Sequence, residues 1–451
     1  MKCIVGIDLG STTTKAVLLD ESGEIVGKGI TNSRSNYAVA ATVARDEALT
    51  AARFSLLERD LANVPEATGE AARGLIEDLQ NAFRLELYLD ELGYLEERVV
   101  NLMRTWPDAV TRGKAEPAVH EVLDEMRATA PEAFLGGRRR SDFFRDLAGA
   151  AFVAGAERVC TGRDVPFERV VGLFDRAILD VETRVQSRDY KALLPGAVER
   201  VAAARGVLVD VRRVLDAAAL HAATEPLEEV AFAGTGYGRQ TLPFPKDAVR
   251  SEILCHGRGA HRIFPGTRSV LDIGGQDTKA IQVDDKGVVT SFQMNDRCAA
   301  GCGRYLGYIA DELNLGLHEL GPLALKATRV VRVNSTCTVF AGAELRERLA
   351  LGQKREDILA GLHRAILLRA MSLLARSGGV ITEFTFTGGV CKNPMATKML
   401  GELVAENYGP DVKLNIHPDS IYMGALGAAM FALDDLRAGK PLLLPAYAAA
   451  A

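Results

Sequence analysis

Two cysteines stand in polar, glycine-containing segments of this chain: Cys298 in NDRCAAGCGRYL and Cys337 in NSTCTVFAGAE. Thiolates are strong metal ligands, and an iron–sulfur cluster is usually held by four of them. Two cysteines supply half of that ligand set, so the other half would come from elsewhere. The residue types therefore predict either a cluster site that a second chain completes or two packed thiols, since free cysteine is among the most buried residue types.

A glycine turn near the N-terminus has the residue types of a phosphate site. It joins two apolar, strand-like segments, CIVGIDLG and TKAVLLD. Glycine lets the backbone approach a phosphate, whose oxygens hydroxyl and N–H groups could cradle. Asp8 is placed to hold a hydrated Mg²⁺, which prefers carboxylate, water and phosphate oxygens. A plain hairpin turn would explain the same pattern. The candidate ligands in this first loop are Gly10, Ser11, Thr12, Thr13 and Lys15.

The same arrangement recurs in the second half of the chain. LDIGGQDTKAIQVD repeats the order found in GIDLGSTTTKAVLLD: strand, Asp, glycine turn, polar residues, Thr-Lys-Ala and a second strand. This duplication indicates two related lobes with a cleft between them, whose two loops could clamp one triphosphate. A third glycine cluster follows EFTFT and suits close approach to an adenosine. The candidate residues of these clusters are Asp272, Gly274, Gly275, Gln276, Asp277, Gly388 and Gly389.

In a chain that also carries candidate phosphate loops, the segments that follow the two cysteines favour metal ligation. AGCGRYLGYIADEL and VFAGAELRERLAL have helical character, so each thiolate would lie near a helix N-terminus. The positive end of the helix dipole stabilises a thiolate there. Small neighbours leave room for a cluster and a partner backbone. We therefore expect Cys298 and Cys337 to be metal ligands.

The other cysteines are assigned to packing. Cys302 lies four positions after Cys298 and could share its helix face, so a packed thiol is expected there, with ligation as the alternative. Cys3, Cys160 and Cys255 stand in apolar or helical surroundings. His256 could form a metal pair with Cys255 by residue type, but a structural histidine is expected.

A long helical segment separates the first loop from the rest. Between about residues 35 and 219 the chain is rich in Ala, Glu, Arg and Leu with helical spacing, as in LYLDELGYLEERVVNLM and AVERVAAARGVLVDVRRVLDAAALHAA. The α/β character returns at EEVAFAGTG. We expect a first lobe of residues 1–34 and 220–268, a helical insertion over 35–219, and a second lobe over 269–451 whose C-terminal helix returns to the first lobe.

Composition narrows the class of protein. The 451 residues are 48% hydrophobic and 25% charged, with a formal charge of −5 and a pI near 5.9, which argues against a nucleic-acid surface. Neither an export signal nor a membrane-spanning segment is apparent in the sequence. Seven irregularly spaced cysteines do not fit a secreted disulfide framework. A reducing, cytoplasmic location is expected.

The three glycine clusters, taken in order, resemble the first phosphate loop, second phosphate loop and adenosine loop of the actin, sugar kinase and heat-shock chaperone ATPase superfamily. This resemblance covers nearly the whole chain outside the helical segment. It implies a two-lobed α/β fold, interrupted here by a large, mostly helical insertion. It also implies that Mg-ATP binds between the lobes and that Asp8 and Asp272 act in its hydrolysis by positioning water.

The cysteine segments point to one family within this superfamily. Together with AGTGYGRQTL, CHGRGA, FTGGVCKN and GALGAA, they resemble the ATP-driven electron activators of 2-hydroxyacyl-CoA dehydratases and of ATP-dependent benzoyl-CoA reductase. In that family each subunit gives two cysteines to one 4Fe–4S cluster that bridges two subunits. The resemblance implies that Cys298 and Cys337 hold such a cluster, which a partner shares.

The length and the insertion are most similar to the longer ATPase subunit of benzoyl-CoA reductase. That resemblance implies a heterotetramer in anaerobic aromatic catabolism. Its partners would be a shorter homologous ATPase subunit, substrate-binding reductase subunits and ferredoxin as the electron donor. ATP hydrolysis would drive low-potential electrons to the aromatic ring of benzoyl-CoA.

The chain departs from the compact activators at three positions and keeps a fourth. Cys302 stands where threonine is usual, Cys391 where alanine is common and Gly342 where glutamate is usual, while Glu344 is retained as a candidate cofactor-site residue. Three other functions stay open: a dehydratase activator, a small-molecule kinase of the same fold, and a nucleotide-gated binding module like the chaperones. The kinase would need a catalytic base facing an acceptor pocket, and the binding module would leave the cysteine loops unexplained.

Overall fold

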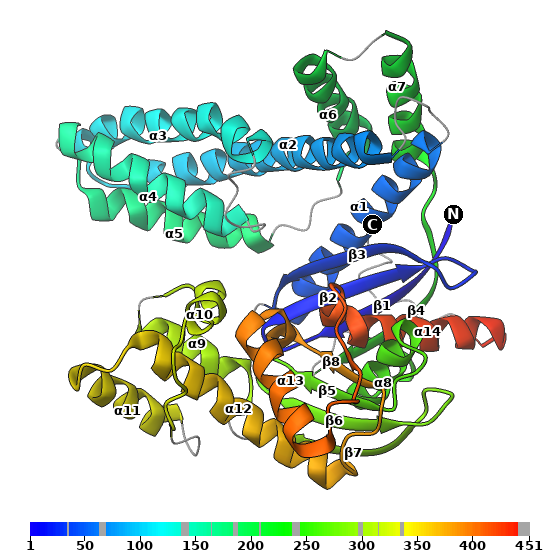
Figure 1. Ribbon diagram of the computed structural model, residues 1–451. Helices are drawn as coiled ribbons and strands as arrows, with labels where there is room; N and C mark the ends of the chain where they lie inside the picture. Colours follow the sequence, from blue (N-terminus) through cyan, green and yellow to red (C-terminus); the bar gives the residue numbers. More distant parts are fainter. Residues whose placement is uncertain are drawn as a thin grey trace. The chain divides into compact units, whose positions relative to one another are not determined.

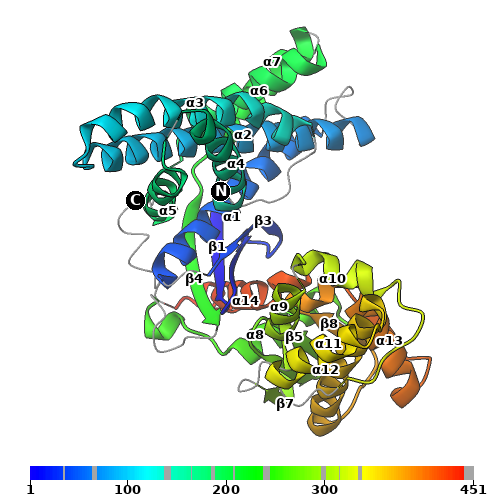
Figure 2. The same ribbon diagram turned by 90° about the vertical axis from the view of Figure 1, so that its left-hand side faces the viewer.

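The computed structural model describes residues 1–33, 36–62, 69–136, 144–163, 165–183, 188–206, 209–236, 244–295, 301–313, 315–333 and 338–440. The chain divides into two compact units (Figures 1 and 2). The first combines Met1–Ala51 with Leu227–Ala451, and the second is Ala52–Pro226. The helical unit therefore begins and ends later along the chain than the expected insertion over residues 35–219.

The first sheet of unit 1 contains four strands: β1 (Lys2–Leu9), β2 (Thr13–Leu19), β3 (Ile25–Asn32) and β4 (Glu228–Gly236). Their order is β3-β2-β1-β4, with β1 antiparallel to β2 and parallel to β4. β1 is apolar along most of its length and is buried on both faces, as the central strand of a covered sheet must be. Asp8 lies at its C-terminal end, beside the first loop.

The second sheet repeats this plan. Its strands are β5 (Ser269–Ile273), β6 (Thr278–Val283), β7 (Val289–Asn295), β8 (Phe384–Thr387) and β9 (Leu414–Asn415), in the order β7-β6-β5-β8-β9. The register repeats as well. In the first sheet Asp8 pairs with Lys15 on β2 and Thr235 on β4. In the second, Asp272 pairs with Lys279 on β6 and Thr387 on β8, so the duplication seen in the sequence is a duplication of strand pairing.

Two helices pack tightly beside these sheets, α8 (Glu252–Ile263) and α14 (Met423–Arg437). A Cβ on Gly259 of α8 would lie 2.1 Å from the carbonyl oxygen of Met423, and a Cβ on Gly427 of α14 would lie 1.9 Å from that of Cys255. Only glycine permits this approach. α14 packs on β1 and β4, so the C-terminal helix lies against the first sheet, as Figure 1 also shows.

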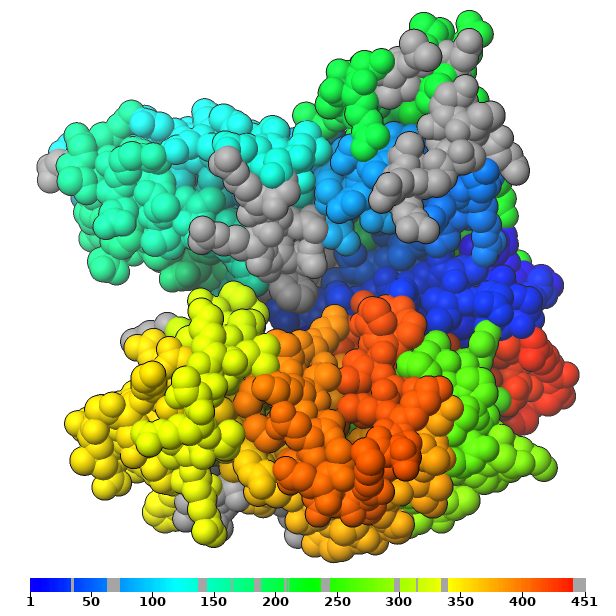
Figure 3. Space-filling view, viewed as in Figure 1, coloured from blue at the N-terminus to red at the C-terminus, as the bar shows by residue number. Residues whose placement is uncertain are grey.

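The remaining helices of unit 1 are α1 (Tyr37–Leu61), whose end enters the helical unit, and α9 (Gly303–Glu312), α10 (Leu317–Ala324), α11 (Thr338–Ala350), α12 (Arg355–Ser377) and α13 (Pro394–Tyr408). Short 3-10 turns occur at Lys246–Ala248, Gly389–Lys392 and Ser420–Tyr422. By residue number, α9 to α13 lie in the part of the face coloured yellow-green to orange in Figure 3. Among the described residues, α12 alone has the length and composition to cross a membrane, and most of it is buried in the core of the second lobe.

The helical unit consists of α2 (Gly69–Arg104), α3 (Ala109–Leu135), α4 (Phe144–Arg163), α5 (Phe167–Thr183), α6 (Tyr190–Arg205) and α7 (Val209–Thr224). The C-terminal half of α2 packs with α3, α4 and α5 around one apolar core. The segment from Ala197 to Ala223, which the sequence suggests as one amphipathic stretch, is two helices. Gly206 ends α6 with a φ of +61°, a left-handed conformation that glycine adopts readily.

Candidate active site

Asp8 and Asp272 lie at corresponding ends of the two central strands, and α8 brings them together. His256 of α8 lies between them, with Nε2 3.9 Å from Asp8 Oδ2 and Nδ1 3.3 Å from Asp272 Oδ1. Glu252, one helical turn before His256, points the same way, with Oε1 4.0 Å from His256 Nε2. All four side chains are buried. The structure thus assembles a polar centre from both lobes.

A buried lysine neutralises part of this centre. Lys279 Nζ lies 2.8 Å from Asp277 Oδ1, 2.9 Å from Glu252 Oε1 and 3.2 Å from Asp272 Oδ2. Burial alone would lower the pKa of Lys279, but these carboxylates raise it well above its ordinary value. Burial would likewise raise the pKa of Asp272, yet His256, Lys279 and the Thr387 hydroxyl lower it to about 2. Asp272 is therefore held as a carboxylate.

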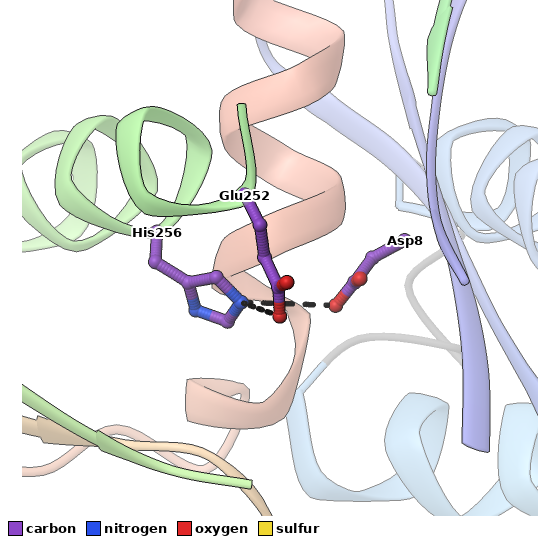
Figure 4. A group of neighbouring side chains, drawn as sticks. All are labelled: Asp8, Glu252 and His256. Carbon is purple, nitrogen blue, oxygen red and sulfur yellow. Dashed lines mark ion pairs between the residues drawn. The ribbon is translucent and has the colours of Figure 1, made fainter. Parts of the chain in front are cut away.

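Asp8 has fewer hydrogen-bond and ion-pair contacts than Asp272 in the described part of the chain. Burial raises its pKa above the ordinary value, and the nearby charges of Lys15, His256 and Lys279 only partly oppose this effect. Among the described residues, Asp8 Oδ1 and His256 Nδ1 are buried without a hydrogen-bond partner. Gly424, in the first turn of α14, closes this side, because a Cβ there would lie 2.6 Å from Asp8 Oδ2 and 2.8 Å from His256 Nε2. Figure 4 shows Asp8, Glu252 and His256 pointing toward one another.

The two phosphate-loop candidates meet beside this centre. A Cβ on Gly275 would lie 2.1 Å from Thr12 Oγ1, so the second loop touches the first through a glycine. Lys15 Nζ donates to the carbonyl oxygen of Thr13 at 3.1 Å, and Ser33 Oγ donates to that of Gly10. The Gly274 N–H donates to the Asp277 carbonyl at 2.9 Å, which closes the second turn. Ser11, Thr13 and Gln276 are half-buried in these turns, and Thr12 is exposed.

The third glycine cluster lies against the second loop. Gly388 has a φ of +87°, and a Cβ on it would lie 2.3 Å from the carbonyl oxygen of Ile273. The preceding Thr387 donates its hydroxyl to Asp272 Oδ1 at 3.0 Å. Gly389 begins the following 3-10 turn and has open space where a side chain would be. The adenosine-loop residues therefore share a wall with Asp272.

Cys298 and Cys337 lie outside the described residues. The structure does describe the helices that follow them, α9 and α11. Gly342 of α11 contacts Tyr308 of α9, and Arg346 of α11 pairs with Glu312 of α9 at 2.5 Å. These contacts join α9 and α11 along neighbouring helical turns. Glu344 belongs to this region: it lies on α11 and pairs with Arg348 at 2.6 Å. Cys302 and Cys391 are buried, and burial raises the pKa of Cys391 to about 11.

Backbone hydrogen bonds join the second phosphate loop to the start of α9. The Gly303 N–H donates to the Gly274 carbonyl at 2.8 Å, and the Arg304 N–H donates to the Gly275 carbonyl at 2.7 Å. The hydroxyl of Thr278 donates to the carbonyl of Gly301. The loop and the segment after Cys298 are therefore directly connected.

Sequence reasoning missed Glu252, His256, Lys279 and Thr387 as members of the centre. The repeat of Thr-Lys-Ala after each loop was a signal for Lys279, and the spacing of four between Glu252 and His256 was a signal for a shared helix face. What brings these side chains together is the position of α8. Cys255 packs with α14 and β4, which agrees with its assignment to packing.

Comparison with known proteins agrees with this architecture. The sequence profile of the BadF/BadG/BcrA/BcrD ATPase family matches residues 5–432. The (R)-2-hydroxyglutaryl-CoA dehydratase activating ATPase of Acidaminococcus fermentans is 42% identical over 206 residues, which cover 46% of this chain and 76% of that protein. One of the benzoyl-CoA reductase subunits of Thauera aromatica is 35% identical over 199 residues, which cover 44% of this chain and 70% of that protein.

The crystal structure of the A. fermentans (R)-2-hydroxyglutaryl-CoA dehydratase component A superposes with a TM-score of 0.52 at 22% sequence identity. The superposition covers 97% of this chain and all of that one. Together with the paired sheets, this shared fold confirms the predicted two-lobed α/β fold.

Proposed function

Because the chain belongs to the BadF/BadG/BcrA/BcrD ATPase family, we propose that it uses ATP hydrolysis to drive low-potential electron transfer to a partner acyl-CoA enzyme. Our first assignment is the electron-activating subunit of benzoyl-CoA reductase, acting with a shorter homologous ATPase subunit, substrate-binding subunits and ferredoxin. The thiolates of Cys298 and Cys337 would hold a 4Fe–4S cluster that the homologous subunit completes. The location would be the cytoplasm, where thiols stay reduced.

One observation carries the proposal: the second phosphate loop is hydrogen-bonded to the helix that follows Cys298. Gly303 and Arg304 donate their N–H groups to the carbonyls of Gly274 and Gly275. A phosphate that moves this loop must therefore move the start of α9. Such a link is what ATP-driven control of a cluster requires, because cluster potential responds to charge, hydrogen bonds and solvent exposure.

The donor set fits an iron–sulfur cluster. Cys337 directly precedes Thr338, the first residue of α11, and α9 begins five positions after Cys298. Each cysteine therefore comes shortly before the positive N-terminal end of a helix, which would stabilise a thiolate. A bound cluster would supply a one-electron carrier. Two cysteines per chain supply half of the usual four ligands, which supports a second, homologous chain as the other donor.

ATP would bind where the three glycine clusters meet. Backbone N–H groups and the hydroxyls of Ser11, Thr12 and Thr13 would hold the phosphates, and Lys15 would offset their charge. Mg²⁺ would be held through Asp8 and phosphate oxygens. Asp272 remains ionised, with its pKa lowered to about 2, and can accept a hydrogen bond from the attacking water. Hydrolysis would then relax the contact between the Thr12 and Gly275 loops.

A specific observation also favours a second assignment, the activator of a 2-hydroxyacyl-CoA dehydratase. The dehydratase activating ATPase is 42% identical over 206 matched residues, whereas the benzoyl-CoA reductase relative is 35% identical over 199. The large helical unit, Ala52–Pro226, speaks for the first assignment, because it gives docking surface beyond the ATPase core. The two differ in ATP use. A reductase consumes ATP with every product, whereas an activator of a catalytic electron uses far less than one ATP per product.

The decisive experiment is anaerobic co-expression with a homologous partner, followed by iron, sulfide and EPR analysis. We expect a complex with about four irons per pair of chains, and Cys298→Ala or Cys337→Ala should each remove the iron. Cys160→Ala is the matched control, because that thiol is buried within the helical unit. An iron-free complex with full ATPase activity would refute the cluster assignment. Phosphate transfer to a metabolite in air, without iron, would favour a small-molecule kinase instead.

A further inference from the structure

We propose that Asp8, Glu252 and His256 form a protein-bound site for a divalent first-row transition-metal cation of the Mn²⁺ class, filled before the nucleotide arrives. This site is separate from the cysteine segments, and its existence does not depend on the cluster assignment. It shares Asp8 with the Mg²⁺ that would enter with ATP, but differs from that ion because Glu252 and His256 complete its protein ligands before nucleotide binds.

The geometry suits one shared ion. Asp8 Oδ2 and Glu252 Oε1 lie 3.9 Å and 4.0 Å from His256 Nε2, and the three ligand atoms lie within 4.8 Å of one another. These gaps are too long for hydrogen bonds. They fall within the range of separations that the ligands of one metal show, because bonds of about 2.1 Å place neighbouring ligand atoms roughly 3.0 Å apart and opposite ones roughly 4.2 Å apart. The three side chains converge on this gap (Figure 4).

The orientation of His256 is the second, independent observation. Its Nε2 faces Asp8 and Glu252, while its Nδ1 lies 3.3 Å from Asp272 Oδ1. A metal-bound histidine usually presents its other ring nitrogen to a carboxylate, which fixes the tautomer and directs the lone pair to the metal. Asp272 is itself held by Thr387 and Lys279. Asp8 Oδ1, buried without a hydrogen-bond partner in the described part of the chain, leaves a further oxygen for the ion.

The charges around the gap favour a divalent cation. Asp8, Glu252, Asp272 and Asp277 bring four carboxyl groups, beside which the centre holds the buried ammonium of Lys279 and the imidazole of His256. Lys15 is half-buried and donates to the Thr13 carbonyl. Buried charge is costly unless it is paired, so an additional cation would balance this centre.

The donor types indicate which cation binds. Mg²⁺ prefers oxygen ligands and keeps several waters, whereas an imidazole nitrogen suits first-row transition metals. The imidazole favours a first-row transition metal, and the two carboxylates suit Mn²⁺, which is the paramagnetic member of this class used as the probe below. The glutamate and histidine stand four residues apart on one helix, the spacing that places two ligands on the same face. We therefore expect Mn²⁺ to bind more tightly than Mg²⁺ when nucleotide is absent.

The test is Mn²⁺ binding to the chelator-treated, nucleotide-free protein, followed by EPR. We expect about one Mn²⁺ per chain, retained against excess Mg²⁺, with pulsed-EPR modulation from one directly bound imidazole ¹⁴N. His256→Gln should abolish this modulation and weaken Mn²⁺ binding at least about tenfold. His417→Gln is the matched control, because His417 also faces a carboxylate, with Nδ1 3.8 Å from Asp419 Oδ2, but stands half-exposed away from the centre.

A labelling experiment on the unmodified chain keeps the test independent of folding of the variant. Protein grown with ¹⁵N-histidine should replace the ¹⁴N modulation by that of ¹⁵N. Absence of bound Mn²⁺, or bound Mn²⁺ without any histidine coupling, would overturn the proposal, as would coupling that survives in a folded His256→Gln protein. Iron content, measured on the same samples, reports on the cluster separately.

Discussion

The ammonium of Lys279 lies 3.2 Å from the carboxylate of Asp272, with both side chains almost wholly buried. This pair is the counterpart of Asp8 and Lys15, which occupy the same cross-strand register in the first sheet. The two copies have diverged. Lys279 binds three carboxylates inside the centre, whereas Lys15 is half-buried and reaches the carbonyl of its own loop.

Replacing Lys279 should therefore destabilise the whole protein. Lys279→Met would leave Asp272, Asp277 and Glu252 without their shared cation, and removing one partner of a buried ion pair costs about 3–5 kcal/mol. Chemical denaturation of the nucleotide-free protein measures this loss. Lys15→Met is the control: it should lower ATPase activity while reducing stability by about 1 kcal/mol or less. Equal stability losses in the two variants would contradict the distinct roles of the two lysines.

Replacing Asp8 or Asp272 by asparagine should change the stability of the protein in opposite directions. The folded-state pKa of Asp272 is about 2, below the ordinary value, so its carboxylate stabilises the fold above about pH 4 and loses that effect as pH falls toward 2. Asp272→Asn should cost on the order of 2 kcal/mol at pH 7. Burial instead raises the folded-state pKa of Asp8, so its carboxylate opposes folding at neutral pH. Asp8→Asn should raise the melting temperature of the metal-free protein.

Melting curves of both variants between pH 4 and pH 8 provide the measurement. The gain from Asp8→Asn should shrink as the pH falls, because the wild-type carboxyl then takes up its proton. Both variants should lose ATPase activity, which separates stability from function. A destabilised, metal-free Asp8→Asn protein would mean that burial does not disfavour this carboxylate.

The sequence pointed to those residues of the polar centre that belong to the repeated motif. Asp8 and Asp272 end two similar strands, and each is followed by glycine and Thr-Lys-Ala, so both could be identified without a structure. Glu252 and His256 have no such repeat. Their role arises because α8 packs against both α14 and the second sheet, and this contact depends on glycines far apart in the sequence.

The helical unit illustrates a different limit. Its helical character was clear from composition and spacing, but the break at Gly206 was not, because the apolar pattern continues across it. Helical residues also continue beyond the expected end at residue 219, since α7 extends to Thr224. Periodicity reports which residues are helical more reliably than where one helix ends and the next begins.

Thr278 offers a way to weaken the link between the phosphate loop and α9. Its buried hydroxyl donates to the Gly301 carbonyl, so Thr278→Val would leave that oxygen unpaired at a cost of about 1–3 kcal/mol. We expect ATPase activity within about threefold of wild type, while the nucleotide-dependent change in the cluster EPR spectrum becomes smaller. Thr290→Val, at a more accessible position of β7, should change neither property. An unaltered nucleotide response in the Thr278→Val protein would show that the signal takes another route.

Gly424 tests whether ATP hydrolysis needs Asp8 and His256 in the positions that the structure shows. A methyl group at this position would lie 2.6 Å from Asp8 Oδ2 and 2.8 Å from His256 Nε2, so Gly424→Ala must displace one or both side chains. A shift approaching 1 Å in a catalytic group can lower a rate about 100-fold. We expect the ATPase kcat to fall by roughly that factor, with a stability loss of about 1–3 kcal/mol from overpacking.

Gly172→Ala is the matched control, because Gly172 lies within α5 and has open space where the methyl would stand. Alanine is the better helix former, so this variant should keep its ATPase rate and gain up to about 1 kcal/mol of stability. Nucleotide affinity, measured by calorimetry, distinguishes a displaced catalytic group from a blocked binding site. If Gly424→Ala binds ATP normally but turns over slowly, Asp8 and His256 act in the chemical step. If the folded variant hydrolyses ATP at the wild-type rate, neither side chain is needed in the position found here.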